Sequence, residues 1–183
     1  MIKSDLWIEK MVREHNMIEP FAPEQVRDGC ISYGLSSYGY DMRLSNEFMI
    51  WRGNRDSFID PKNMSAGSFD ELIADVCVIP AGSYVLGRSL EYFRMPDNIM
   101  GTCVGKSTLA RCGIVVNVTP LEPGWEGHLT ISIINGASSG VKLYAEEGIA
   151  QILFFQGDEI CRTTYKDKRG KYDAQRGVTL AKM

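Results

Sequence analysis

The chain has 183 residues, of which 44% are hydrophobic, and a formal net charge of -3. This length predicts one domain over residues 1–183 with a sizeable core, and it is too short for two ordinary domains. A slightly acidic chain has no general attraction to a nucleic-acid backbone or an anionic membrane, which argues against both as partners. No run approaches the roughly 18 apolar residues of a membrane span, and the charged start lacks the pattern of a secretory leader.

The chain carries five cysteines, an odd number at wide spacing. This usage is typical of a reduced, cytoplasmic protein rather than of a secreted disulfide framework. We expect the thiols to be small core residues, namely Cys30, Cys77, Cys103, Cys112 and Cys161.

A short N-terminal helix is expected first, capped by Ser4 and carrying one apolar stripe of Trp7, Ile8, Met11 and Val12. Residues 64–69 are expected to form at most a surface loop. Short β-rich runs then recur at roughly ten-residue spacing, separated by turn signals, and predict a mainly β barrel or sandwich with few helices. These runs are Val76–Ile79, Ser83–Leu86, Ile99–Val104, Ile114–Val118, Leu129–Ile134, Val141–Tyr144, Ile149–Phe155 and Ile160–Tyr165.

The most informative segment is Gly105-Lys106-Ser107-Thr108-Leu109-Ala110-Arg111. It supplies a glycine, an ammonium, two hydroxyls and a guanidinium, which are donors suited to phosphate oxygens. It is not a P-loop, because Met100 stands where the first glycine is required and residues 112–120 predict a strand rather than a helix. The C-terminal end is also basic, with seven Lys or Arg and two Asp in residues 162–183. That end is either a solvated face or a contact for a polyanionic small ligand.

Further segments share the order of one family. They are Ile2-Lys3-Ser4-Asp5 with Trp7, Met17-Ile18-Glu19-Pro20-Phe21, Ser36-Ser37-Tyr38-Gly39-Tyr40-Asp41-Met42-Arg43, the Gly105–Arg111 segment, Glu122-Pro123-Gly124-Trp125-Glu126-Gly127, Gln151, and Gly170-Lys171-Tyr172 with Gln175. Taken together and in this order, they resemble the dCTP deaminases, relatives of the trimeric dUTPases. The matching segments run nearly from end to end of the chain.

The resemblance implies a homotrimer of distorted β-barrel, or jelly-roll, subunits of the dUTPase-like type. It implies active sites between subunits and a basic tail, residues 166–183, that closes over bound nucleotide. The implied reaction is hydrolytic deamination of dCTP to dUTP and ammonia, which supplies dUTP for dUMP and dTTP synthesis. Mg²⁺ would accompany the triphosphate, dTTP is a possible inhibitor, and no metal would perform the chemistry. The residues themselves also argue against a catalytic zinc, because a zinc deaminase needs His-x-Glu and Pro-Cys-x-x-Cys elements that this chain lacks.

The resemblance also assigns the site residues. It places Ser107 and Arg111 near the reacting base, Glu122 at the sugar, and the backbone of Thr130, Ile131 and Ser132 at the pyrimidine edge. The other substrate-binding positions are Lys106, Thr108, Leu109, Ala110, Gln151, Tyr165, Lys171 and Gln175. Read singly, each of these residues also has an ordinary structural explanation, such as a capped turn for Ser107 and Thr108 or a surface ion pair for Arg111. His128 is expected to be structural, since it has no recognisable catalytic partner.

One position departs from the family pattern. The family's general base is a glutamate on this strand, and Ser132 occupies its place within Thr130-Ile131-Ser132-Ile133-Ile134-Asn135. A serine hydroxyl does not accept a proton from water near neutral pH, and general acid–base catalysis contributes about 10² to 10⁴ in rate. Four explanations remain open: a substitute carboxylate such as Glu122 or Glu126, nucleotide binding without deamination, a variant of an active enzyme, or dUTP pyrophosphatase activity.

Overall fold

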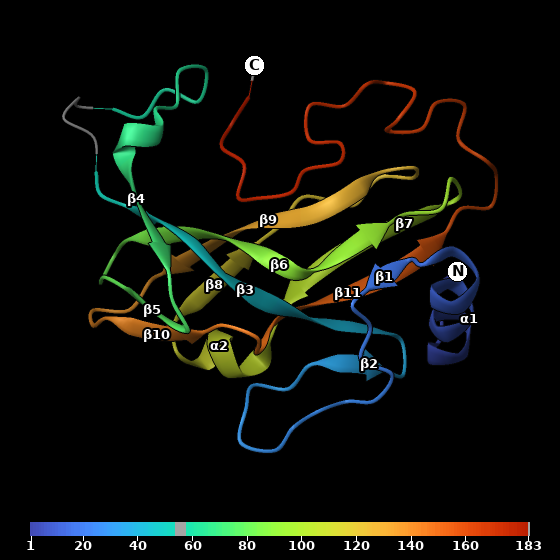
Figure 1. Ribbon diagram of the computed structural model, residues 1–183, viewed down its shortest axis with the longest axis horizontal. Coiled ribbons are helices and arrows are strands. Elements are labelled where there is room, and N and C mark those ends of the chain that lie inside the picture. The colour runs from blue at the N-terminus through green and yellow to red at the C-terminus, as the bar shows by residue number, and fades with distance from the viewer. Residues whose placement is uncertain (54–57, 183) are drawn as a thin grey trace.

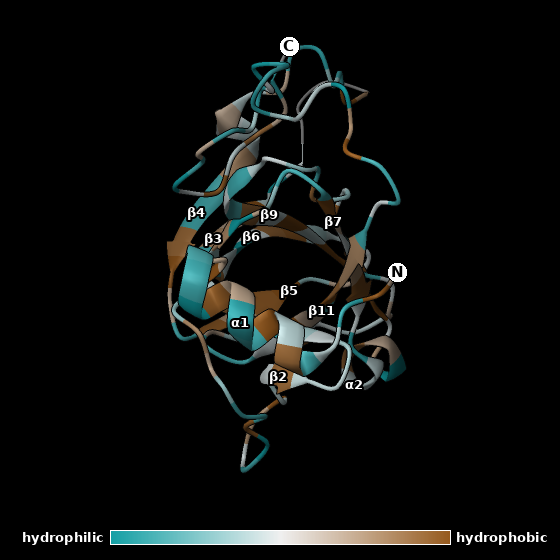
Figure 2. Cartoon of the chain, turned by 90° about the vertical axis from the view of Figure 1, so that its right-hand side faces the viewer, coloured by the Kyte–Doolittle hydropathy of each residue, from teal (hydrophilic) through white to brown (hydrophobic). Residues whose placement is uncertain are grey.

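In the computed structural model, which describes residues 1–53 and 58–182, the chain opens with the expected helix α1 (Asp5–His15). Ser4 takes the N-cap position, but its backbone oxygen, rather than its side chain, accepts a hydrogen bond from Ile8 N at 3.0 Å. Ile8 is fully buried, and Trp7 and Met11 pack at the edge of the core. Figure 2 shows α1 lying across one end of the curved sheet. The apolar stripe therefore anchors the helix to the strands.

Strands dominate the rest of the chain (Figure 1). The short elements are β1 (Ile18–Glu19), β2 (Gly34–Ser36), the 3-10 helix η1 (Ala66–Ser68), β4 (Phe69–Ile73), β5 (Val76–Ile79), α2 (Ser107–Arg111), β8 (Ile114–Asn117) and β10 (Val141–Tyr144). The longer strands are β3 (Gly39–Trp51), β6 (Tyr84–Arg94), β7 (Ile99–Gly105), β9 (Glu126–Asn135) and β11 (Gly148–Gln156). The mainly β fold with one short N-terminal helix is therefore confirmed.

The long strands and β8 form one antiparallel sheet in the order β7-β11-β3-β6-β9-β8, with β1 paired to β6 and both β2 and β4 paired to β3. The two edge strands approach each other, since a Cβ on Gly105 of β7 would meet Val116 of β8 at 3.7 Å. The sheet is therefore nearly closed into a barrel. β5 and β10 pair separately as a second, two-stranded sheet.

Residues of β9 alternate between the core and the outer face of the barrel, as the period of a strand requires. Leu129, Ile131 and Ile133 are buried, whereas Thr130 and Ser132 between them are partly exposed. The buried side chains join those of the other long strands and of α1 in a single hydrophobic core. This alternation places Thr130 and Ser132 together on the outer face.

Three expectations are wrong. Cys112 and Cys161 are exposed rather than part of the core, and Cys30 is only partly buried. Residues 160–165 form turns rather than a strand, because Ile160 is 77% exposed and the Thr164 N–H and hydroxyl both donate to Asp167 instead of to a neighbouring strand. Residues 64–69 are not simply a loop, since they contain η1 and the first residue of β4. Met183, the last residue of the expected tail, lies outside the described residues. Among the helices in the described ranges, none has the length and apolar character needed to span a membrane.

Candidate functional site

A cavity of about 690 Å³ lies between β9, the loop before it and the C-terminal tail, which folds back over the barrel (Figure 1). Four residues expected to bind substrate line it, namely Glu122, Thr130, Tyr165 and Gln175. The other lining residues are Val118, Thr119, Pro120, Leu121, Trp125, Leu129, Tyr172 and Thr179. The fold therefore gathers, around one hollow, residues that are up to 61 positions apart in the chain.

The tail is held along an edge of β9 that β8 does not reach, because β8 pairs only with residues 132–135. Ala174 N donates to Glu126 O at 2.9 Å, and His128 N donates to Gln175 O at 3.0 Å. Trp125 Nε1 donates to Tyr172 O at 2.8 Å. These bonds attach the tail as a short strand-like addition over the cavity.

The backbone of Thr130 faces this same edge. Successive residues of a strand direct their N–H and C=O groups to alternate edges. The backbone N–H and C=O of His128 both form hydrogen bonds with Gln175 of the tail, so the N–H and C=O of Thr130, two residues further along, point to the same edge. The Thr130 hydroxyl accepts a hydrogen bond from Thr179 N at 3.0 Å. Paired donors and acceptors on a strand edge are suited to reading the edge of a planar base.

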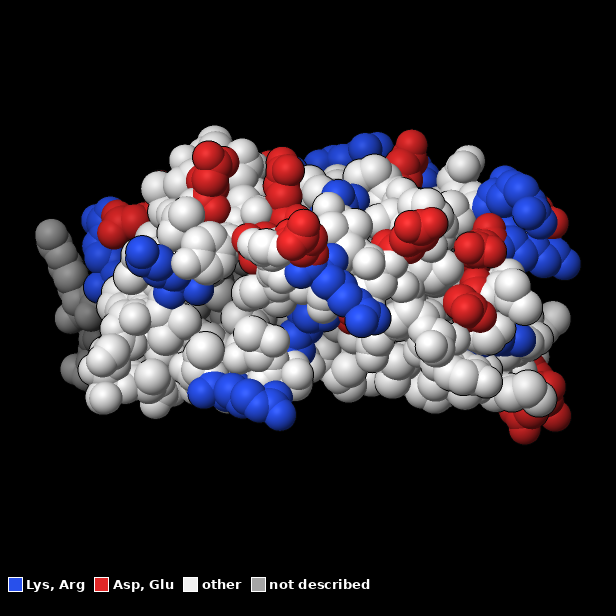
Figure 3. Space-filling view, turned by 90° about the horizontal axis from the view of Figure 1, so that it is seen from below, with Lys and Arg blue, Asp and Glu red and all other residues white. Residues whose placement is uncertain are grey.

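The Gly105–Arg111 segment lies elsewhere, at the opposite end of the molecule in Figure 1, as the end of β7 and the helix α2. Arg111 is exposed, and its Nη1 donates to Ser107 O at 2.9 Å. Thr108 lines a separate, open cavity of about 740 Å³ with residues that include Arg27, Ser32, Tyr144 and Glu147. Figure 3 shows basic and acidic side chains interspersed on the face seen from below. Anion binding there would depend on particular groups rather than on the net charge of the face.

Other expected site residues are occupied by contacts within the chain. The Leu109 side chain is 3% exposed and belongs to the core, so only its backbone is open to a ligand. Lys106 Nζ lies 2.9 Å from Asp41 Oδ2, and Gln151 Nε2 donates to Ser36 Oγ at 2.8 Å. Lys171 Nζ donates to Lys182 O at 3.3 Å, within the tail itself.

Ser132 lies on the outer face of β9, opposite Leu86 of β6 and Asn117 of β8. Glu126 precedes it by six residues on the same strand, which places it about 20 Å away. Glu122 lines the cavity, and its Oε2 lies 2.7 Å from Lys168 Nζ in the tail. Of the two carboxylates considered as substitutes for the family glutamate, Glu122 is the one that lines this cavity.

A charged cluster under the tail gave no sequence signal, because its members come from three different strands. Arg88 of β6 lies 2.5 Å from Glu47 Oε1 of β3 and 3.2 Å from His128 Nδ1 of β9. The Arg88 hydrogen bond lowers the pKa of Glu47. Burial, and then the nearby Arg88 charge, lowers the pKa of His128, so the neutral imidazole is favoured. His128 fits the structural role expected for it, since its Nδ1 also lies 3.0 Å from Glu91 O.

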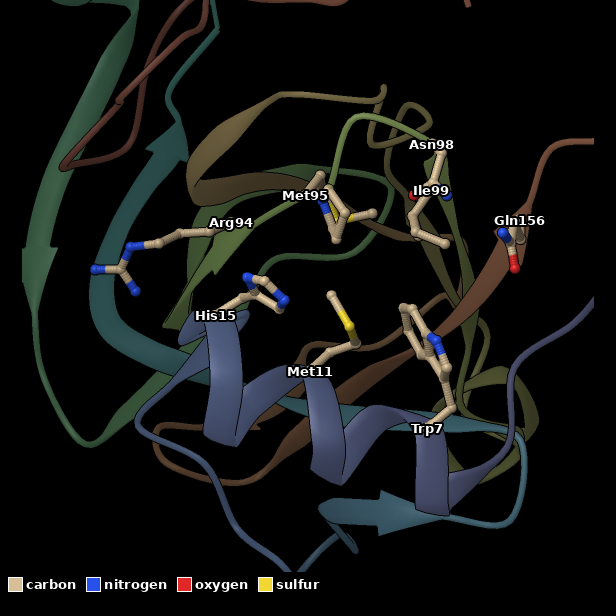
Figure 4. A pocket seen from close by; sticks show the side chains of 9 residues that line it. Trp7, Met11, His15, Arg94, Met95, Asn98, Ile99 and Gln156 are labelled. Atoms are coloured by element: carbon tan, nitrogen blue, oxygen red, sulfur yellow. The ribbon is translucent and has the colours of Figure 1, made fainter. Parts of the chain in front are cut away.

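A further cavity of about 470 Å³ separates α1 from the turn between β6 and β7. Figure 4 shows Trp7, Met11 and His15 pointing from the helix toward Met95 and Ile99. None of the expected site residues lines it. Within residues 1–53 and 58–182, no three His, Cys, Asp or Glu side chains gather as a metal site.

Comparison with known proteins places these features in a family. The model of a family described as dCTP deaminase-like matches residues 2–157. The chain is 56% identical to the dCTP deaminase of Methylococcus capsulatus, over 99% of this chain and 98% of that protein. It is also 56% identical to that of Campylobacter jejuni, over 100% and 98%. The crystal structure of 2′-deoxycytidine 5′-triphosphate deaminase from Agrobacterium tumefaciens has the same fold, with a TM-score of 0.64 at 16% identity, covering 85% of this chain and 48% of that chain.

Proposed function

The chain belongs to the dCTP deaminase-like family, and from this premise we propose that it hydrolyses dCTP to dUTP and ammonia. The observation that carries the proposal is the 56% identity to dCTP deaminases over essentially the whole chain, which includes the tail as well as the barrel. In the reaction, water adds to C4 of the cytosine ring, the amino group leaves as ammonia, and a carbonyl forms. The enzyme must therefore orient the base, hold the triphosphate and move protons at C4.

The cavity under the tail is suited to the base and sugar. The backbone groups of Thr130 can pair with the pyrimidine edge, and Glu122 is close enough in the same hollow to meet the sugar. Gln175 belongs to the covering tail and Tyr165 directly precedes it, and the tail would exclude water once the nucleotide is bound. Ser107 and Arg111 would contribute hydroxyl and guanidinium donors to the phosphates and near the base.

The active site is proposed to form between copies of the chain, in a homotrimer. Support comes from the separation of α2 from the tail cavity, which face opposite ends of one subunit (Figure 1). Beside Ser132, the directly paired Val115 and Ile134 are 55% and 40% exposed on the outer face. A second copy would cover this apolar pair and bring its own α2 to the cavity. Sedimentation equilibrium that gives the mass of a single chain would contradict the trimer.

Mg²⁺ is proposed to enter with the triphosphate rather than to occupy a site made by the protein. Hard oxygen ligands of a nucleotide suit Mg²⁺, which commonly keeps several waters and binds substrate phosphates. The free thiols fit a reducing cytoplasm, where a dCTP-consuming enzyme meets its substrate. Inhibition by dTTP stays a prediction, and a dCTP titration in its presence would test it.

The decisive experiment concerns Ser132. Purified protein is incubated with dCTP and Mg²⁺, and ammonia, dUTP and dUMP are followed together, beside a Ser132→Glu variant. We expect wild-type protein to release dUTP and ammonia in equal amounts, and Ser132→Glu to be faster by about 10² to 10⁴ if no other group serves as base. Turnover by the variant alone would show a nucleotide site without a catalyst, and dUMP would indicate pyrophosphate hydrolysis.

A further inference from the structure

Asp41 belongs to the Ser36–Arg43 segment that carries part of the family resemblance, yet the proposed reaction gives it no role. It lies on β3 and is 4% exposed. Its Oδ2 is fixed by two donors, Gln25 Nε2 at 2.7 Å and Lys106 Nζ at 2.9 Å. A buried carboxylate is retained at acceptable free energy only when charged and hydrogen-bonding groups satisfy it in this way. The arrangement is therefore a built feature of the barrel end.

Lys106 connects this carboxylate to α2. It is the residue that precedes the helix, and its side chain is only 10% exposed, since it turns inward to Asp41. The helix has just five residues, and Ala110 N donates to Lys106 O at 3.0 Å. So short a helix is not stable by itself, and its position depends on its anchors. The anchors are the Lys106–Asp41 pair at its start and the buried Leu109 in its middle.

The strand register accounts for the position of Asp41 near the end of β7. Asp41 lies directly opposite Gln151 of β11, and Gln151 lies opposite Val104 of β7, two residues before Lys106. Gln151 Nε2 in turn donates to Ser36 Oγ at 2.8 Å. The pairing therefore places Asp41 and Gln151 beside the end of β7, and the Gln151–Ser36 bond links β11 to β2 there.

We propose that Asp41 is a positioning residue for phosphate binding: through Lys106 it holds the start of α2, so that Ser107 and Arg111 meet the triphosphate in a fixed geometry. The inference rests on the proposed function, because it assumes that α2 contacts the nucleotide. Asp41 itself touches no ligand. Loss of its charge should weaken triphosphate binding through the displaced helix.

The test measures dissociation constants of dCTP and of inorganic tripolyphosphate by titration calorimetry, which needs no turnover. Asp41→Asn is expected to weaken tripolyphosphate binding by about tenfold or more. The double variant Asp41→Asn/Lys106→Gln is expected to bind no more weakly than Lys106→Gln alone, because the two residues act as one unit. Unchanged affinity in Asp41→Asn, or losses that add in the double variant, would overturn the inference.

The matched control is Glu91→Gln, which removes charge from another buried pair, with Arg43 Nε at 2.8 Å. It is expected to lower thermal stability and leave tripolyphosphate affinity unchanged, and a comparable loss of affinity would overturn the specific role of Asp41. If Asp41→Asn does not fold, Gln25→Leu serves instead, because it removes one hydrogen-bond donor to Asp41 and keeps the ion pair. We expect it to weaken tripolyphosphate binding by less than Asp41→Asn would, and unchanged affinity would count against the inference. Wild-type protein that binds neither probe would overturn the proposed nucleotide site, and this inference with it.

Discussion

The closed tail should open more often when Trp125 loses its indole N–H. Trp125 is 5% exposed, and its Nε1 donates to Tyr172 O at 2.8 Å. Trp125→Phe leaves that carbonyl without its donor, and a typical intramolecular hydrogen bond contributes about 1 kcal/mol net. Since 1.4 kcal/mol corresponds to about tenfold, the open population of the tail should rise about fivefold.

Limited trypsin digestion measures this opening, because the tail offers Lys168, Arg169 and Lys171 as cleavage sites. When opening and closing are fast relative to cleavage, the cleavage rate follows the open population. The control is Trp51→Phe, since the Trp51 ring stacks on Tyr84 at 5.4 Å, and no hydrogen bond among the described residues joins its side chain to the tail. Tail cleavage of Trp125→Phe at the wild-type rate would refute the reasoning.

Further predictions concern other parts of the chain. Because the pKa of His128 lies below its ordinary value of 6.5, its contribution to folding stability is present above pH 6.5 and lost as pH falls through the lower pKa of the folded state. The free energy of unfolding measured in urea should therefore fall as the pH is lowered toward about 5, and this fall should be smaller in His128→Gln. Burial raises the pKa of Cys77 to about 11 and of Cys103 to about 12. Iodoacetamide should therefore label the two exposed cysteines, Cys112 and Cys161, first, and peptide mass mapping would show the order of labelling. Arg111→Ala should strongly weaken dCTP binding at unchanged melting temperature, and equal wild-type affinity would contradict its role. Deleting residues from Gly170 onward should impair nucleotide retention more than thermal stability, whereas equal losses would indicate a structural tail.

The regular strands could be predicted from the sequence because their apolar residues alternate and turn residues end them. β5 and β10 have the expected bounds, and β9 extends the expected Leu129–Ile134 by a few residues. β3 was not predicted, because most of its residues are buried but two of them, Asp41 and Ser45, are polar and interrupt the apolar pattern expected of a buried strand. The side-chain partners of Asp41, Gln25 and Lys106, lie on other segments of the chain and become visible only after folding.

The candidate site was predicted in part, and only through the family resemblance. The motif order pointed to the residues of the tail cavity, whose assembly depends on a parallel bridge between Gly127 and Gln175. No local pattern indicated that Lys106 would be buried against Asp41, because charge pairing across a barrel leaves no periodic signal. The same holds for the Arg88 cluster under the tail.

One measurement tests the central claim, which is dCTP deamination at a site shared between copies of the chain. Arg111→Ala disables the α2 part, and Gln175→Ala disables the tail cavity, so each variant alone should convert dCTP poorly. Random mixing of the two in co-expressed trimers leaves about a quarter of the sites with both parts intact. The account predicts dUTP and ammonia production near a quarter of the wild-type specific activity. If the wild type is active but the mixed trimers are no more active than the average of the two variants, the site is not shared between copies. A wild type that releases no ammonia would contradict the deamination itself.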